Sequence, residues 1–232
     1  MTVILDDGER VADLPSDPAT AARVVRIDGY ADLRGYAHPL PALRRIDGWA
    51  ILRDYAHALP DGLIVGGALD LSGCTALTTL PPGLTVGGAL DLSGCTALTA
   101  LPDGLTVRGW LDLTGCTGLT ALPDGLSVGA SIDLRGCTGL TALPAALSVG
   151  GSLYLSGCTG LDHYCVGRDA RGYAFYGIPM RDGPHVVAGC RNFTGAQALA
   201  HWGPGGESDR PDCLALAQKA IVLIERSKEV WT

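Results

Sequence analysis

The chain has 232 residues and 47% of them are apolar, yet only 6% are aromatic and 33 are glycine. Its formal net charge is −7, and no basic stripe is present to collect phosphates, which argues against binding to nucleic acid or to an anionic membrane surface. No apolar run approaches the length of a membrane span, and the start "MTVILDDGER" lacks the basic-then-apolar order of a secretory signal. We therefore expect a cytoplasmic protein, with export by a route that needs no cleaved signal left open.

Residues 1–25 predict an N-terminal cap made of a hairpin and a short helix. The hairpin turns around Asp7-Gly8, a dipeptide that favours tight turns. Asp17 before Pro18 is typical of a helix start, because aspartate accepts bonds from the free amides there and proline has a suitable backbone angle.

Residues 26–161 form a repeated segment. Its Leu-Pro pairs recur at a constant interval and begin at Leu59, Leu80, Leu101, Leu122 and Leu143. Looser copies that start at Ile27 and Ile46 lie upstream with a slightly shorter spacing. A period of about 21 residues is too short for one copy to bury its own leucines, so successive copies must stack as the coils of a solenoid. The sequence predicts about seven coils.

The core of the repeat is "LDLSGCTAL", which spans Leu69–Leu77 in the first of the near-identical copies. This LxLxGCxxL core, with its "LTxLPxGLxV" tail, resembles the leucine-rich repeat proteins, and in particular the short bacterial variety found in secreted effectors. The resemblance implies a parallel β-sheet on the concave face and little helix on the convex side. It also implies that a partner binds on the concave face. The recurring prolines predict an extended outer arc.

Alternation along the predicted strand points Leu69 and Leu71 inward and Asp70 outward, so the aspartates of four consecutive coils align on the open face. We interpret this face as an acidic strip for a basic partner, flanked by tryptophan and tyrosine anchors. The predicted partner-binding residues are Tyr30, Asp32, Trp49, Asp70, Asp91, Trp110, Asp112, Asp133, Arg135 and Tyr154. Two alternatives stay open, namely a solvated face left by repeat duplication and a cation that bridges adjacent carboxylates.

Five cysteines occupy one position in consecutive coils, at Cys74, Cys95, Cys116, Cys137 and Cys158. In leucine-rich repeats this position turns inward to pack and to bond the backbone, which suits a small apolar thiol. Disulfides between coils would leave one cysteine over, and a metal site needs convergent ligands rather than a ladder. Unpaired thiols also favour a reducing compartment.

Residues 162–232 predict an α+β capping module whose family we do not identify. Three short strands are expected first, followed by a helix from Thr194 to about Gly203 and a last helix that begins near Pro211. The simplest role for Cys165, Cys190 and Cys213 is to fill a small core.

Two chemical alternatives remain for this module. His163, Cys165, His185 and Cys190 could supply a zinc tetrad, although no C-x-x-C pair anchors it. Cys190, His201 and Asp212 could supply a nucleophile, a base and an orienting carboxylate. Effectors with similar repeats often carry a ubiquitin-ligase domain with a Cys-x-Asp motif, but this chain has the order Asp212-Cys213, so that activity does not carry over.

Together these patterns predict a β-rich repeat solenoid with a small α+β C-terminal cap. We expect it to bind another protein with a basic surface through the concave face, without catalytic residues, metal or cofactor. A small thiol- or metal-dependent activity at Cys190 and His201 is the alternative, and a purely structural or decoy repeat protein is the third.

Overall fold

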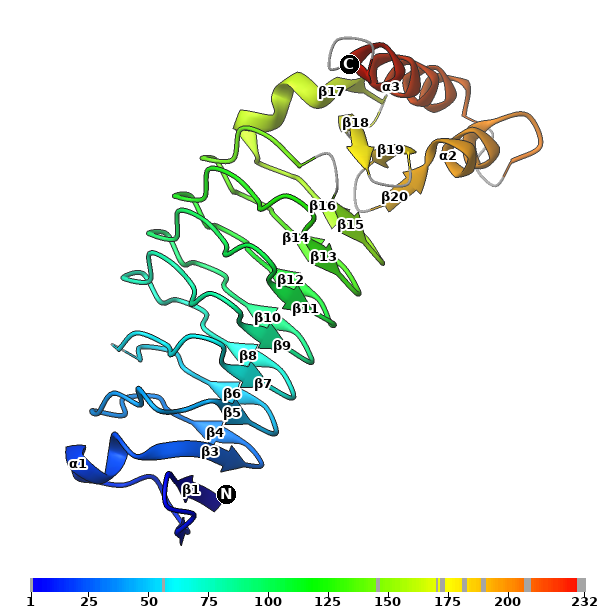
Figure 1. The fold of residues 1–232 in the computed structure, drawn as a ribbon. Helices are drawn as coiled ribbons and strands as arrows, with labels where there is room; N and C mark the ends of the chain where they lie inside the picture. The colour runs from blue at the N-terminus through cyan, green and yellow to red at the C-terminus, as the bar shows by residue number, and fades with distance from the viewer. Residues whose placement is uncertain are drawn as a thin grey trace.

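The computed structural model describes residues 2–55, 57–144, 147–169, 171, 174–180, 183–188, 191–206 and 210–228. Figure 1 shows an elongated stack of coils that runs from an N-terminal hairpin to a separate group of strands and helices at the other end. Each coil contributes two short strands, and equivalent strands of successive coils form two parallel sheets. The chain is a β-solenoid with few helices and a small α+β module at its C-terminal end, in agreement with the predicted fold class.

The first sheet contains one strand from each of seven coils and carries the "LxL" cores. Its strands are β4 (Ala31–Asp32), β6 (Ala50–Ile51), β8 (Leu69–Asp70), β10 (Leu90–Asp91), β12 (Leu111–Asp112), β14 (Ile132–Asp133) and β16 (Leu153–Tyr154). The strands follow one another in this order and pair in parallel, with Leu90 beside Leu69 and Leu111. Equal positions of successive coils therefore lie next to each other.

The second sheet is formed by the tail of the repeat, for which the sequence predicts only an extended arc. Its parallel strands are β3 (Val24–Asp28), β5 (Arg45–Ile46), β7 (Ile64–Val65), β9 (Thr85–Val86), β11 (Thr106–Val107), β13 (Ser127–Val128) and β15 (Ser148–Val149). Val86 points into the core while Thr85 faces outward, and the same alternation recurs in the next coils. The proline-containing arc lies between the two sheets of each coil.

Glycine recurs at two positions of the coils, although residues such as Asp47 and Arg108 replace it at the first and Asp54 at the second. At the corner between the sheets, a Cβ on Gly87 would lie 2.2 Å from the backbone oxygen of Gly66 in the preceding coil, so no side chain fits. At the turn that follows the "LxL" core, Gly73 has a φ of 74°. Asp54 occupies this turn position one coil earlier with a φ of 59°, and no other non-glycine residue in the described part of the chain has a positive φ.

Leucines from every coil fill the space between the two sheets and the arc. Leu90, Leu111 and Leu153 of the first sheet are fully buried, as are Leu98 and Leu119 of the arc. Each such side chain contributes about 2 kcal/mol by leaving water. The stacked leucines make one continuous core that runs the length of the solenoid.

The N-terminal end of the stack is covered by an antiparallel extension of the second sheet. Strand β1 (Thr2–Leu5) pairs with β2 (Arg10–Val11) on one side and with β3 on the other. A single helical turn, α1 (Pro18–Ala21), follows, and its cap Asp17 accepts a bond from the amide of Thr20 at 2.8 Å. The helix ends early because the chain enters β3 at Val24.

The C-terminal module contains four antiparallel strands rather than the three predicted. After a 3-10 helix (Thr159–Tyr164), they are β17 (Cys165–Arg168), β18 (Ala174–Met180), β19 (Gly183–Ala188) and β20 (Arg191–Thr194), paired in chain order. Helix α2 (Gly195–Trp202) starts at the capping box of Thr194 and Gln197, and α3 (Pro211–Lys228) follows. In the described residues, no helix is long and apolar enough to cross a membrane.

The strands of this module pack on both sides. Tyr176, Ile178 and Val187 join the core of the solenoid and so cover its last coil. Phe175 and Val186 point the other way, into a second core that includes residues of α2 and α3. The module is therefore attached to the solenoid through a shared apolar core.

Candidate functional site

The outward side of the seven-stranded sheet forms the acidic face, which is defined by its central column of aspartates and the residues beside it. The register places Asp70, Asp91, Asp112 and Asp133 side by side, with Ile51 before them and Tyr154 after them. This is the alignment that the sequence predicted. Asp32 continues the column beside Ile51, at the N-terminal edge of the sheet.

Each aspartate in the column also has a structural role. Its Oδ1 accepts a hydrogen bond from the backbone amide two residues later, at 3.0 Å for Asp70, 2.9 Å for Asp91 and 2.8 Å for Asp112. Such bonds hold the chain at the turn that leaves the strand. The hydroxyls of Ser72 and Ser93 add a second bond at 2.7 Å each. An asparagine would keep the backbone bond and lose the charge.

Arginines neutralise part of the column but not its middle. Arg34 pairs with Asp32 in the same coil, and Arg135 pairs with Asp133 in the same way. Arg53 instead reaches one coil further along the stack and pairs with Asp70 at 2.6 Å. Within the described residues, Asp91 and Asp112 make no ion pair. The negative potential of the face is therefore concentrated at these two positions.

The pKa of Asp133 shows how the arginine offsets burial. Only 7% of Asp133 is exposed. Burial alone would raise its pKa, but the bonds from the Arg135 guanidinium and backbone amide lower it below the ordinary value. Asp70 follows the same pattern, with burial opposed by Arg53 and Ser72. Both carboxylates are charged at neutral pH.

Large aromatic side chains flank the acidic column on its exposed side. Tyr30 and Trp49 are 51% and 44% exposed and stack on each other with ring centroids 4.9 Å apart. Trp110 is 43% exposed and lies three coils further along, beside Asp91 and Asp112. The guanidinium of Arg135 lies 5.7 Å from the ring centre of Tyr154. All ten predicted partner-binding residues thus lie on one face.

The five repeat cysteines are buried and unpaired, as expected for packing residues. Each thiol donates to a leucine carbonyl of the preceding coil, for example from Cys116 Sγ to the oxygen of Leu92 at 3.1 Å. The same carbonyl accepts the amide of Cys95 at 3.1 Å, so one oxygen joins two coils. Burial raises the pKa of Cys95 to about 12 and that of Cys116 to about 11, which makes these thiols unreactive.

The chemical alternatives in the C-terminal module gain no support from the geometry. Cys190 lies outside the described residues, and so do the side chains of His163 and Cys165. His185 is buried with its Nδ1 2.9 Å from Oδ1 of Asn192, and His201 stacks on Phe193. In the part of the chain that the structure describes, no three His, Cys, Asp or Glu side chains are placed to hold a metal ion.

A buried carboxylate in this module was not singled out by the sequence. The side chain of Asp169 is 1% exposed and pairs with Arg171 at 3.1 Å and with Arg210 at 3.6 Å. Cys213 lies beside it, with 4.0 Å between Sγ and Oδ2, and burial raises the pKa of that thiol. The cluster attaches the start of α3 to the end of β17, which is a structural task.

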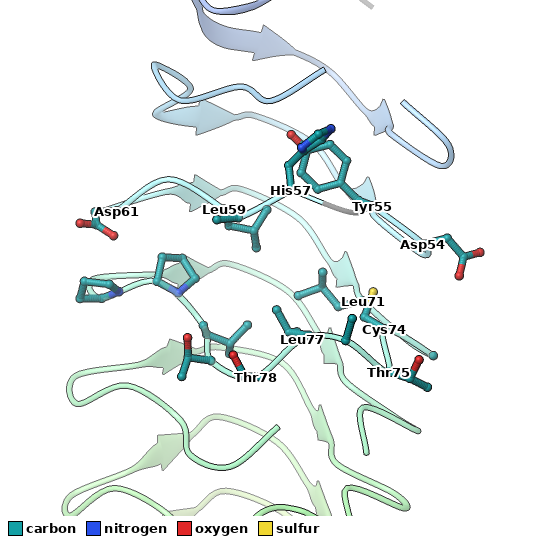
Figure 2. Close-up of a pocket in the computed structure, with 17 residues that line it drawn as sticks. Asp54, Tyr55, His57, Leu59, Asp61, Leu71, Cys74, Thr75, Leu77 and Thr78 are labelled. Carbon is teal, nitrogen blue, oxygen red and sulfur yellow. The ribbon is translucent and has the colours of Figure 1, made fainter. Parts of the chain in front are cut away.

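A pocket that the sequence did not predict lies on the arc between the second and third coils. It has a volume of about 580 Å³. Figure 2 shows Tyr55 and His57 on one side, Leu71, Leu77 and Cys74 on the other, and Asp54 and Asp61 at opposite ends. The signal that could have found it is the lengthening of the repeat after the second coil.

Comparison with known proteins finds no relative from which a function could be inferred. No protein-family model, no curated protein and no solved structure matches the chain. What the acidic face binds is therefore inferred from its own charges, exposure and rigidity.

Proposed function

We propose that the chain is a protein-binding module of the leucine-rich repeat type, in its short bacterial form, and that its acidic face binds a basic protein. The observation that carries this proposal is the group of Asp91, Asp112 and Trp110. It combines two carboxylates without an ion pair in the described residues and a tryptophan that is 43% exposed. Tryptophan and charged groups at the centre of a face are typical of binding hot spots.

The backbone of this face supports the proposal because it is already ordered. Every strand of the sheet is bonded to its neighbours, and the aspartates are held by the amides of the turns. A rigid surface loses little entropy when it binds. Its charge should speed association with a basic partner and make binding sensitive to salt.

The remaining features fit a binding role inside the cell. Unpaired thiols favour a reducing compartment, which supports a cytoplasmic location. The acidic face disfavours nucleic acid and anionic membranes as partners. We propose no catalytic role for the described thiols, because they are buried and have raised pKa values.

The test removes charge without disturbing the fold. Asp91→Asn with Asp112→Asn keeps the Oδ1 acceptor at both turns and deletes two charges. The matched control is Asp103→Asn with Asp124→Asn, which deletes two charges from exposed turns outside the acidic face. Proteins are captured from cells that make the chain, as salt rises from about 0.05 to about 0.3 M.

The proposal predicts that the native chain captures basic proteins and that salt releases them. The Asp91→Asn, Asp112→Asn chain (the face variant) should capture about tenfold less of them, and the control should capture as much as the native chain. Trp110→Ala should cause a loss of similar size. Equal capture by the face variant and the control would contradict the proposal, as would a captured set without basic proteins.

A further inference from the structure

The pocket on the arc originates in a mismatch between neighbouring coils. The arc of the second coil runs from Leu52 to Leu63, whereas the next arc runs from Leu71 to Leu84 and is longer by two positions. All later coils that the repeat contains keep the longer spacing. The shorter arc cannot cover the longer one, so a hollow remains between them (Figure 2).

Because of this mismatch, the pocket exposes apolar side chains whose equivalents in later coils are buried. Leu77 is partly exposed in the pocket, whereas Leu98, Leu119 and Leu140, at the same position of later coils, are 0% exposed. Cys74 is 8% exposed and Cys95 is 0% exposed. The floor of the pocket is therefore apolar, and covering Leu77 fully would stabilise whatever binds there by about 1 kcal/mol or more.

The pocket also contains the open end of a backbone ladder. Between the longer coils, the amide of Thr99 donates to the oxygen of Thr78 at 3.1 Å, and that of Thr120 donates to the oxygen of Thr99 at 3.2 Å. The amide of Thr78 would continue this ladder toward the second coil. It has no protein acceptor within the described residues, and Thr78 lines the pocket. A free donor beside an apolar floor suits the carbonyl of an extended peptide.

The charges at the rim are all negative. Asp54 and Asp61 lie at opposite ends of the pocket, both are exposed, and neither makes an ion pair within the described residues. No lysine or arginine is among the described residues that line it. The aromatic wall is fixed in place, because His57 Nε2 lies 2.9 Å from the oxygen of Ala37 and Tyr55 Oη donates to the oxygen of His38 at 3.3 Å.

We propose that this pocket binds an extended peptide segment of a partner protein, in which a leucine-sized side chain is flanked by lysine or arginine. The apolar side chain covers Leu59 and Leu77. A peptide carbonyl accepts the amide of Thr78, and the basic flanks lie near Asp54 and Asp61. The site is separate from the acidic face and does not depend on what that face binds.

The test compares the native chain with one whose second and third coils have arcs of equal length. In the repaired variant, residues 54–58 are replaced by the longer sequence of positions 73–79, "GCTALTT", which gives the second coil the longer arc. The probe is the peptide acetyl-Lys-Val-Leu-Val-Lys-amide, and its acidic counterpart with two glutamates is the control. Binding is followed by the NMR shifts of backbone amides in the full chain.

The proposal predicts that only the basic peptide shifts amide signals, and that these signals belong to Cys74–Thr79 and the facing arc. The Kd for this peptide should be at least about tenfold higher in the repaired variant. Ala76→Trp, at an exposed position of the lining, should block the pocket, and Ala97→Trp in the next coil should not. The Asp91→Asn, Asp112→Asn chain should bind the peptide normally, which separates this site from the acidic face. Equal shifts with both peptides, unchanged binding in the repaired and Ala76→Trp variants, or no shifts at all would overturn the proposal.

Discussion

Replacing Cys116 with alanine tests whether the repeat cysteines join the coils. Its side chain is 0% exposed, and its thiol donates to the oxygen of Leu92 at 3.1 Å. Removing the sulfur deletes about as much buried volume as one methyl group, which costs about 1 kcal/mol. Loss of the weak hydrogen bond adds about 0.5 kcal/mol, since Leu92 keeps the amide of Cys95 as a donor. We expect the free energy of unfolding to fall by about 1.5 kcal/mol, the sum of these two losses.

The matched control is Cys74→Ala, at the same position of the coil beside the pocket. Cys74 is 8% exposed and its bond to the oxygen of Leu52 is longer, at 3.4 Å. We expect a loss of about 0.5 kcal/mol there, because the site can be filled by water or by neighbours. Urea unfolding followed by far-ultraviolet circular dichroism measures both. If Cys74→Ala cost as much as Cys116→Ala, or neither change had an effect, the thiol ladder would not stabilise the stack.

Three further outcomes follow from the structure. Burial raises the pKa values of Cys95 and Cys137 to about 12, so the stability they contribute is present below about pH 9 and is lost as the pH rises toward 12. A stability that is flat to about pH 11 would contradict this. Arg135→Ala leaves the buried Asp133 carboxylate without its cation and should lower the free energy of unfolding by about 1–2 kcal/mol. Arg34→Ala removes the partner of an exposed carboxylate and should lower it by less than about 0.5 kcal/mol in the same unfolding assay. Asp54 has a φ of 59°, a backbone angle that glycine adopts more easily than other residues. Asp54→Gly should therefore leave the free energy of unfolding unchanged or slightly higher, and Asp54→Ala should lower it by about 1 kcal/mol. Equal melting temperatures of the two variants would show that the turn is unstrained.

The alignment of the aspartates was predictable because the repeat has a fixed length. Parallel coils of equal length place equal positions side by side, so Asp91 had to lie between Asp70 and Asp112. The ion pairs did not follow from the repeat. Arg34 and Arg135 pair within their own coils, while Arg53 reaches the next coil, and the choice depends on side-chain rotamers that spacing does not determine.

The second sheet and the pocket were harder to foresee for different reasons. The "TV" strands are so short that an alternating pattern cannot be distinguished from an extended arc. The pocket depends on a small difference in length between adjacent coils, which becomes a cavity only when the coils stack. In the C-terminal module, Asp169 meets Arg210 through tertiary packing between distant parts of the chain, and no local pattern indicates such a contact.

The most direct test of the proposed function is site-specific photo-crosslinking in cells that make the chain. A benzoylphenylalanine at Ala89, between Trp49 and Trp110 on the acidic face, reports on that surface. The same group at Thr106, exposed on the other sheet, is the control. We predict an adduct with a basic protein from position 89 and none from position 106. Adducts of equal yield from both positions, or from position 106 alone, would contradict the assignment of the acidic face as the binding surface.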